Sequence, residues 1–291
     1  MSYDILAIDT VVNIWTPEVR AIRPPRDAFY GGKMKVSEET LQGLTHEDML
    51  RRMDVAGIER SFLIAAKNGP YQHRAAYHIP YEMVAEAVNQ YPDRFSGLAG
   101  LDPTEGMAGV RLLEKGVKEY GFIGAHFYPH WFELAPDHAK WYPFYAKCVE
   151  LDVPVQLQVG QSMLYDPNYR LRSVGRPIAL DAVACDFPEL KLIGIHVGIP
   201  WTEEMIAMAW KHPNVYIGTD AHSPKYWPAS FVHYINTFGQ DKVIFGTDFP
   251  VLGFERTRAE IEALELRPAA KKKLLRDNAL RIYGLDKGDQ A

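Results

Sequence analysis

Histidine and aspartate residues directly follow short apolar segments at several places in this sequence, and the two clearest cases are His196 and Asp248. His196 directly follows the segment Leu192–Ile195, and Asp248 directly follows the segment Phe245–Thr247. An imidazole beside a carboxylate can move a proton, polarise a carbonyl group or bind a divalent cation. We therefore expect an active site around this pair, with Asp248 as general base and His196 polarising a carbonyl group of the substrate.

Other side chains at or near the ends of apolar segments are candidates for the same site. His126 is expected to be a third catalytic group, because an imidazole can donate a hydrogen bond to an anion. Arginines can bind carboxylates through two parallel hydrogen bonds, and flat aromatic rings suit a cyclic ligand. The expected substrate-binding residues are Asn13, Trp15, Tyr128, Gln158, Arg170, Arg172 and His222. Arginines in loops can equally be solvated surface groups, an alternative that also applies to Arg20, Arg23 and Arg26.

The elements that must position these residues can be identified from the hydrophobic pattern. Short β-branched segments alternate with amphipathic helical segments along the chain, which is typical of parallel βα units. The expected strands are Ile5–Val12, Arg60–Ala66, Phe95–Leu101, Ile123–Phe127, Val153–Val159, Lys191–Val197, Val215–Gly218 and Lys242–Gly246. Eight such units predict an α/β fold of the (β/α)₈ TIM-barrel type, in which the carboxyl ends of all strands meet at one mouth. An open doubly wound sheet is disfavoured, because no glycine-rich phosphate loop follows the first strand.

Length and composition limit the organisation of the chain and its partners. The 291 residues fit one barrel of about 250 residues, so we expect a single domain over residues 1–291 with a Pro-rich loop insertion at about 15–44 as a lid or pocket wall. The net charge of −5 argues against nucleic acid, and no apolar run approaches the ~20 residues that cross a membrane. We expect a small-molecule substrate. The loops could also build a homodimer interface.

The cellular compartment is suggested by two weak signals. No basic segment of a signal peptide precedes the first expected strand, and Cys148 and Cys185 are the two cysteines of the chain, each in a helical apolar stretch. Two buried thiols are the simplest interpretation, and they favour a reducing environment. We therefore expect a cytoplasmic protein.

Four segments of the chain resemble the amidohydrolase superfamily, in particular its amidohydrolase-related subgroup. The segments Leu192–Trp201 and Phe245–Pro250 resemble the subgroup's sixth and eighth strands. Phe144–Val155 resembles the helix that leads into its fifth strand, and Asp277–Gly284 resembles its C-terminal helix. The subgroup includes aminocarboxymuconate semialdehyde decarboxylase, aromatic-acid decarboxylases and a pyrone-dicarboxylate lactonase. The resemblance spans nearly the whole chain and implies an amidohydrolase-type barrel.

Three positions depart from the metal site that this resemblance implies. The family's first strand carries a His-x-His pair where this sequence has Val11 and Asn13, and its fifth strand carries a histidine where this sequence has Gln158. Valine cannot bind a metal, and neutral amide oxygens bind cations weakly. His196 and Asp248 alone are fewer than the three protein ligands of a catalytic zinc site. We therefore predict no metal and no other cofactor. The alternative is a single zinc or manganese ion in a site rebuilt from His126, His196, Asp220, His222 and Asp248.

These observations lead to a functional prediction with two alternatives. We predict a metal-independent hydrolase that acts on a small cyclic or aromatic acid or carbonyl compound. Cleavage of a lactone or ester is favoured, because the resemblance to the lactonase implies that the family can hydrolyse esters without a cation. The first alternative is an aromatic or enoic acid decarboxylase with a rebuilt metal site. The second is a barrel that binds a ligand without catalysis.

Overall fold

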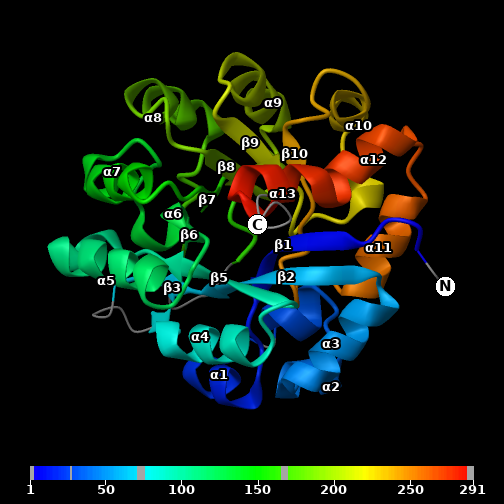
Figure 1. Cartoon of the computed structure of the whole chain (residues 1–291), viewed down its shortest axis with the longest axis horizontal. Helices are drawn as coiled ribbons and strands as arrows, with labels where there is room; N and C mark the ends of the chain where they lie inside the picture. Colours follow the sequence, from blue (N-terminus) through cyan, green and yellow to red (C-terminus); the bar gives the residue numbers. More distant parts are fainter. Residues whose placement is uncertain (1–2, 27, 71–75, 165–169, 287–291) are drawn as a thin grey trace.

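The computed structural model describes residues 3–26, 28–70, 76–164 and 170–286. Eight parallel strands form one sheet in the order β1-β2-β5-β6-β7-β8-β9-β10 (Figure 1). They are β1 (Ala7–Asn13), β2 (Ile58–Ala65), β5 (Phe95–Gly100), β6 (Gly124–Phe127), β7 (Val155–Gln158), β8 (Leu192–Ile195), β9 (Val215–Gly218) and β10 (Val243–Ile244). Each of them overlaps one of the eight strands predicted from the hydrophobic pattern.

The first and last strands close the sheet into a barrel. The backbone N–H of Thr10 donates to the carbonyl of Phe245 at 3.0 Å, and that of Asp248 donates to the carbonyl of Val11 at 2.8 Å. An isolated parallel bridge joins Val12 to Phe249. These bonds confirm the predicted (β/α)₈ barrel, and they bring Asp248 next to the carboxyl end of β1.

Helices surround the strands on the outside of the barrel (Figure 1). The covering helices are α3 (His46–Val55), α4 (Tyr81–Gln90), α5 (Met107–Lys118), α7 (Tyr142–Glu150), α8 (Leu180–Asp186), α9 (Thr202–Lys211), α10 (Ala229–Asn236) and α11 (Phe254–Glu262). Two further helices, α12 (Pro268–Lys272) and α13 (Asn278–Tyr283), follow β10 and are joined by a π-helical turn over Lys273–Asp277. The predicted alternation of strands and helices is therefore confirmed.

Polar side chains inside the barrel are hydrogen-bonded to one another. Gln156 on β7 donates from Nε2 to the carbonyl of Thr10 at 2.8 Å and to the hydroxyl of Tyr283 at 2.5 Å, while its Oε1 is 2.9 Å from Nδ1 of His126. Buried polar groups need such partners, because an unpaired group loses its hydration without compensation. The network ties β1, β6 and β7 to α13, which lies across the ring of strands in Figure 1.

The insertion after β1 is more regular than expected. It contains α1 (Pro17–Ile22), a π-helical turn over Ala28–Lys33 and α2 (Glu38–Gln42). Thr16 and Ser37 cap the two α-helices by accepting hydrogen bonds from backbone N–H groups. Helices of five or six residues are too short to give a helical hydrophobic period, so the sequence pattern suggested an irregular loop.

Three further findings complement the sequence-based expectations. A short antiparallel hairpin of β3 (Lys67–Asn68) and β4 (Tyr77–His78) follows β2 and was not predicted. Cys148 is buried, but Cys185 is exposed, so the expectation of two buried thiols was wrong for Cys185. In the described part of the chain, no helix has the length and apolar character needed to cross a membrane.

Candidate active site

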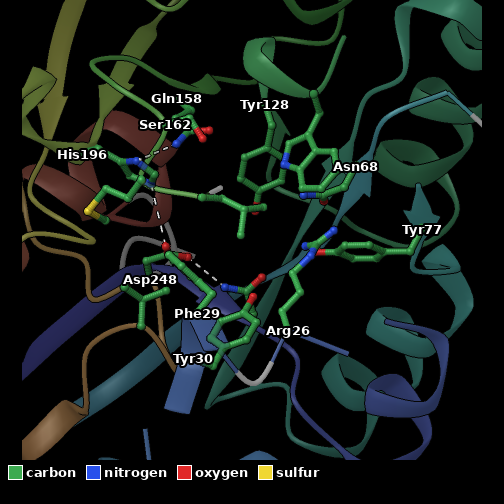
Figure 2. A pocket seen from close by; sticks show the side chains of 15 residues that line it. Arg26, Phe29, Tyr30, Asn68, Tyr77, Tyr128, Gln158, Ser162, His196 and Asp248 are labelled. Atoms are coloured by element: carbon green, nitrogen blue, oxygen red, sulfur yellow. Dashed lines mark hydrogen bonds and ion pairs between the residues drawn. The ribbon is translucent and has the colours of Figure 1, made fainter. Parts of the chain in front are cut away.

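A pocket at the carboxyl ends of the strands gathers residues from β1, β7 and the segments after β8 and β10. Its polar lining residues from these elements are Asn13, Gln158, His196 and Asp248. Figure 2 shows Gln158, His196 and Asp248 on one side of the cavity. The insertion after β1 and the β3–β4 hairpin supply much of the rest, namely Arg26, Phe29, Tyr30, Asn68 and Tyr77. Tyr128 and Trp131 follow β6. The insertion thus forms a pocket wall, as predicted.

His196, Asp220 and Asp248 form a compact cluster at the ends of β8, β9 and β10. Nε2 of His196 is 3.1 Å from Oδ2 of Asp220 and 3.9 Å from Oδ2 of Asp248. The backbone N–H of His196 also donates to Oδ1 of Asp220 at 3.1 Å. Parallel pairing of neighbouring strands explains the proximity, since it brings their carboxyl ends to one edge of the sheet.

The backbone at this cluster adopts an uncommon conformation. His196 has a φ of 70° and Asp248 a φ of 55°, and both are left-handed values that side chains other than glycine rarely adopt. Such backbone strain persists where the surrounding structure enforces it, and it gathers at functional sites. Here it turns each side chain out of its strand and toward the pocket.

Burial and mutual charge set the protonation of the cluster. Burial raises the pKa of Asp248 to about 7, although the positive charge on His196 opposes the shift. For His196, burial acts to lower the pKa, but the carboxylates of Asp220 and Asp248 outweigh it, so the pKa is raised. An imidazolium beside carboxylates and a carboxyl group that titrates near neutral pH can exchange protons with a substrate.

Asn13 is held between Arg23 and Asp248. Arg23 donates from Nη2 to Oδ1 of Asn13 at 3.0 Å, and Asn13 donates from Nδ2 to Oδ1 of Asp248 at 2.8 Å. Because a guanidinium can only donate, the amide of Asn13 must present its NH₂ group to Asp248. The neighbouring strand-end position is Val11, which is fully buried. The positions of the family's His-x-His pair therefore do not fit a cation in this chain.

The cluster of His196, Asp220 and Asp248 does fit a divalent cation. One potential ligand atom from each residue lies within 4.8 Å of the other two. Nε2 of His196 and Oδ2 of Asp220 are buried and have no aligned hydrogen-bond partner among the described residues. Three ligands with imidazole and carboxylate donors suit zinc or manganese. Such a site would be displaced from the first and fifth strands to the sixth, seventh and eighth strands of the barrel.

Of the ten predicted site residues, five line the pocket: Asn13, Tyr128, Gln158, His196 and Asp248. His126 does not, because it is fully buried inside the barrel, where burial lowers its pKa to about 4 and Gln156 binds its Nδ1. Burial likewise lowers the pKa of His222 to about 4, and this residue is not part of the lining. Trp15 is buried behind the pocket wall and donates from Nε1 to the carbonyl of Thr40.

Arg170 and Arg172 lie apart from the pocket. Both are exposed, and the side chain of Arg172 is 81% exposed and 3.8 Å from a carboxylate oxygen of Glu133. Charged side chains in an exposed loop keep their hydration, so nothing draws them into an aromatic pocket. The structure thus places neither of them in the lining of the pocket.

The pocket contains residues that were not among the ten predicted site residues. Arg26, Asn68 and Tyr77 come from the insertion and the hairpin, where no periodic pattern marks the inward-facing positions. One signal was available for the arginine, since Arg23 and Arg26 flank two prolines close to Tyr30. Clustered arginines near aromatic residues can stack on ring faces, which removes them from the surface.

Comparisons with known proteins were made for the sequence and the fold. Residues 8–285 match the model of the family described as Amidohydrolase. A gamma-resorcylate decarboxylase of Polaromonas sp. strain JS666 is 27% identical over 71% of this chain and 75% of its own length. A 2-keto-4-carboxy-3-hexenedioate hydratase of Sphingobium sp. strain SYK-6 is 24% identical over 86% of this chain and 85% of its own. The structure of 5-carboxyvanillate decarboxylase from Novosphingobium aromaticivorans, complexed with manganese, has a TM-score of 0.72 at 19% identity, covering 97% of this chain and 96% of the other.

These relatives overturn two predictions made from the sequence. The prediction of a metal-independent hydrolase was wrong, because the relatives described above carry the names of decarboxylases and a hydratase. The prediction of no cofactor was also wrong, because structural neighbours were crystallised with manganese. Both errors have the same cause. Loss of the ligands on the first and fifth strands was taken as loss of the metal, although carboxylate and imidazole ligands remain together on the other strands.

Proposed function

Because the chain belongs to the Amidohydrolase family, we propose that it is a carboxy-lyase that removes CO₂ from a small aromatic or enoic acid. Gamma-resorcylate decarboxylases of several bacteria and a 2-amino-3-carboxymuconate-6-semialdehyde decarboxylase of Dictyostelium discoideum are among its relatives. The observation that carries the proposal is the buried cluster of His196, Asp220 and Asp248, which adjoins an aromatic pocket. Of the alternatives considered from the sequence, this is the decarboxylase with a rebuilt metal site.

His196 and Asp220 would hold the divalent cation that the proposal requires, and Asp248 lies beside them as the proton donor. When bound, such a cation supplies a fixed positive charge that orients the substrate's oxygen atoms and stabilises negative charge on them. Nε2 of His196 and Oδ2 of Asp220 are buried and lie 3.1 Å apart, so both atoms can face one ion, which supports this assignment. The amide of Gln158 lies 3.1 Å from Nδ1 of His196. With this amide turned so that its oxygen accepts from Nδ1–H, Gln158 would fix the ring orientation and leave Nε2 to bind the cation.

Asp248 is the residue that we assign to proton transfer. Decarboxylation replaces a carboxylate with a proton (R–COO⁻ + H⁺ → R–H + CO₂), so a proton must reach the carbon that bears the carboxylate. Asn13 donates to Oδ1 of Asp248, which leaves Oδ2 to carry the proton. Without the cation, burial raises the pKa of Asp248 to about 7, so this carboxyl group takes up a proton more readily than an exposed one does. As the carbon takes this proton, the C–C bond to the carboxylate breaks, and its electrons return to the ring or double bond.

The aromatic lining complements this chemistry. Tyr30, Tyr128 and Trp131 are nine-tenths buried or more and line the same pocket, so they offer flat apolar surfaces to a ring or a conjugated chain. Apolar walls also exclude water, which strengthens each electrostatic contact inside the pocket. A carboxylate in such surroundings is converted readily to neutral CO₂, because the loss of charge relieves its poor solvation.

The proposal is tested by incubating the manganese-loaded protein with a panel of acids and measuring CO₂. The panel contains 2,6-dihydroxybenzoate, 4-hydroxyisophthalate and 3-carboxymuconate. We expect release of one CO₂ per acid consumed, and Asp248→Asn should lower kcat by about 10²- to 10⁴-fold because a general acid is lost. Asp137→Asn removes an exposed carboxylate and should retain the wild-type rate. Consumption of an acid without CO₂, as in a hydration, or no consumption of any acid would contradict the proposal.

A further inference from the structure

The wall of the pocket opposite His196 and Asp248 carries a buried positive charge. Arg26 lines the pocket with 8% of its surface exposed. Figure 2 shows it together with Asn68 and Tyr77 across the cavity from His196 and Asp248. A guanidinium stays charged at any physiological pH, so this wall is positive under all conditions in which the protein acts.

Two aromatic rings fix the orientation of Arg26. The Cζ atom of its guanidinium lies 4.5 Å from the ring centroid of Trp131 and 5.3 Å from that of Tyr77. A guanidinium held over ring faces has its N–H groups directed outward in its own plane. The acceptor that best matches this planar fork is a carboxylate, which can accept two parallel hydrogen bonds.

Neighbouring groups strengthen the case for an anionic ligand at this wall. Arg23 is also buried, and its Cζ lies 5.0 Å from the ring centroid of Tyr77, so that two guanidinium groups share one ring. Their mutual repulsion is relieved when an anion binds between or beside them. Asn68 lines the same wall, and its buried Oδ1 has no hydrogen-bond partner among the described residues. An amide can present either its oxygen or its NH₂ group to a ligand after a half-turn of the side chain.

We propose that Arg26 and Asn68 form a carboxylate-binding subsite, and that the substrate is a small cyclic or enoic dicarboxylate. One carboxylate lies beside His196 and Asp248, and the second is bound by Arg26 across the pocket. The inference rests on the proposed function in one respect, which is that the first carboxylate is the one that is lost. Binding of the second carboxylate depends on the wall of the pocket and not on turnover.

Calorimetric titration of the manganese-loaded protein tests the subsite directly. The probes are benzoate, with one carboxylate, and isophthalate and terephthalate, with two carboxylates at different spacings. At least one dicarboxylate should bind about tenfold more tightly than benzoate. Arg26→Gln should weaken binding of that dicarboxylate by about 10- to 100-fold and change benzoate binding by less than about threefold, as expected for loss of charge-assisted hydrogen bonds. Arg20→Gln is the matched control, since Arg20 lies in the same insertion over the ring of Trp15 but does not line the pocket.

Two further variants keep the test decisive if Arg26→Gln does not fold. Arg26→Lys keeps the charge but loses the planar fork, and Asn68→Leu keeps the charge and removes the amide. Each should reduce the preference for the dicarboxylate, and circular dichroism with thermal unfolding establishes that the variants are folded. Equal affinity of the wild type for benzoate and both dicarboxylates would overturn the inference. An equal loss of affinity for all three probes in the variants would overturn it as well.

Failure of the inference can be told apart from failure of the proposed function. If the dicarboxylates bind through Arg26 but no acid of the panel releases CO₂, the subsite stands and the carboxy-lyase proposal fails. If CO₂ is released from monocarboxylates as efficiently as from dicarboxylates, and Arg26→Gln leaves kcat/KM unchanged, the carboxy-lyase proposal stands and the subsite is refuted.

Discussion

Replacing Asp248 with asparagine should make the protein more stable at pH 8 while it lowers kcat. The pKa of Asp248 is raised from 3.8 to about 7, chiefly by burial. A raised pKa means that the folded state binds the proton more tightly than the unfolded state does, so stability is lost as the pH rises from 3.8 through 7. A shift of about 3 units at 1.36 kcal/mol per unit corresponds to about 4 kcal/mol lost by pH 8. Asparagine has no charge to bury, and it can still accept the hydrogen bond from Asn13.

The comparison is made by urea unfolding of the wild type and Asp248→Asn at pH 5 and pH 8, with EDTA in the buffer. Between these pH values the wild type should lose about 3 kcal/mol of unfolding free energy through Asp248, and the variant should not. The stability of the variant relative to the wild type should therefore rise by about 3 kcal/mol. His196 keeps Asp220 as a carboxylate neighbour at 3.1 Å, so the substitution does not leave its charge without a partner.

Asp137→Asn serves as the control for removal of a solvated carboxylate, and it should show no pH-dependent gain. If Asp248→Asn is equally or less favoured at pH 8 than at pH 5, then Asp248 does not carry a costly buried charge. The reasoning about proton transfer would then lose its basis. A gain in stability together with loss of turnover would instead indicate that this carboxylate is kept for function at the expense of stability.

Three other outcomes follow from the same geometry. Manganese at about 100 times its dissociation constant should stabilise the wild type by about 2.7 kcal/mol and raise its Tm by roughly 5–10 °C, and His196→Gln or Asp220→Asn should remove this shift in a thermal unfolding assay. Arg23→Met should lower the free energy of urea unfolding by about 2–4 kcal/mol, because it removes buried charge-assisted hydrogen bonds, whereas the exposed Arg51→Met should change it by less than about 0.5 kcal/mol. His126→Gln should leave the pH profile of kcat between pH 5 and 8 unchanged, since burial lowers the pKa of His126 to about 4 and keeps it neutral there; a displaced profile would mean that His126 titrates during catalysis.

The barrel and the two main site residues could be predicted because their signals are local. Each strand is a short run of buried apolar residues, and His196 and Asp248 directly follow such runs. In a parallel barrel every strand ends at the same mouth, so position along the chain is enough to bring these residues together. Asn13 and Gln158, which were predicted to bind substrate, lie in the pocket lining for the same reason.

The opposite wall of the pocket could not be predicted, because its signals are not local. Arg26, Asn68 and Tyr77 lie on short helical turns and two-residue strands, which leave no hydrophobic period in the sequence. Arg170 and Arg172 were favoured on residue type alone, and residue type does not tell whether a loop arginine is solvated or stacked on a ring.

The metal was misjudged because the ligands were compared position by position with the family's first and fifth strands. Whether Asp220 can serve as a metal ligand depends on how the ends of β8, β9 and β10 are arranged in space. In the structure, Oδ2 of Asp220 lies 3.1 Å from Nε2 of His196. That arrangement is set by strand pairing and by the left-handed backbone at His196 and Asp248. Neither feature can be read from residue type.

The central claim, that this barrel is a carboxy-lyase with Asp248 as proton donor, is tested most directly by turnover in D₂O. The manganese-loaded protein is incubated with the acids of the panel, and the products are analysed by mass spectrometry and proton NMR. The account predicts that at least one acid loses CO₂ and gains a single deuterium at the carbon that carried the carboxylate, and that Asp248→Asn forms this product at least about 100-fold more slowly. Recovery of every acid unchanged, or a product that retains all its carboxylates, would contradict the account.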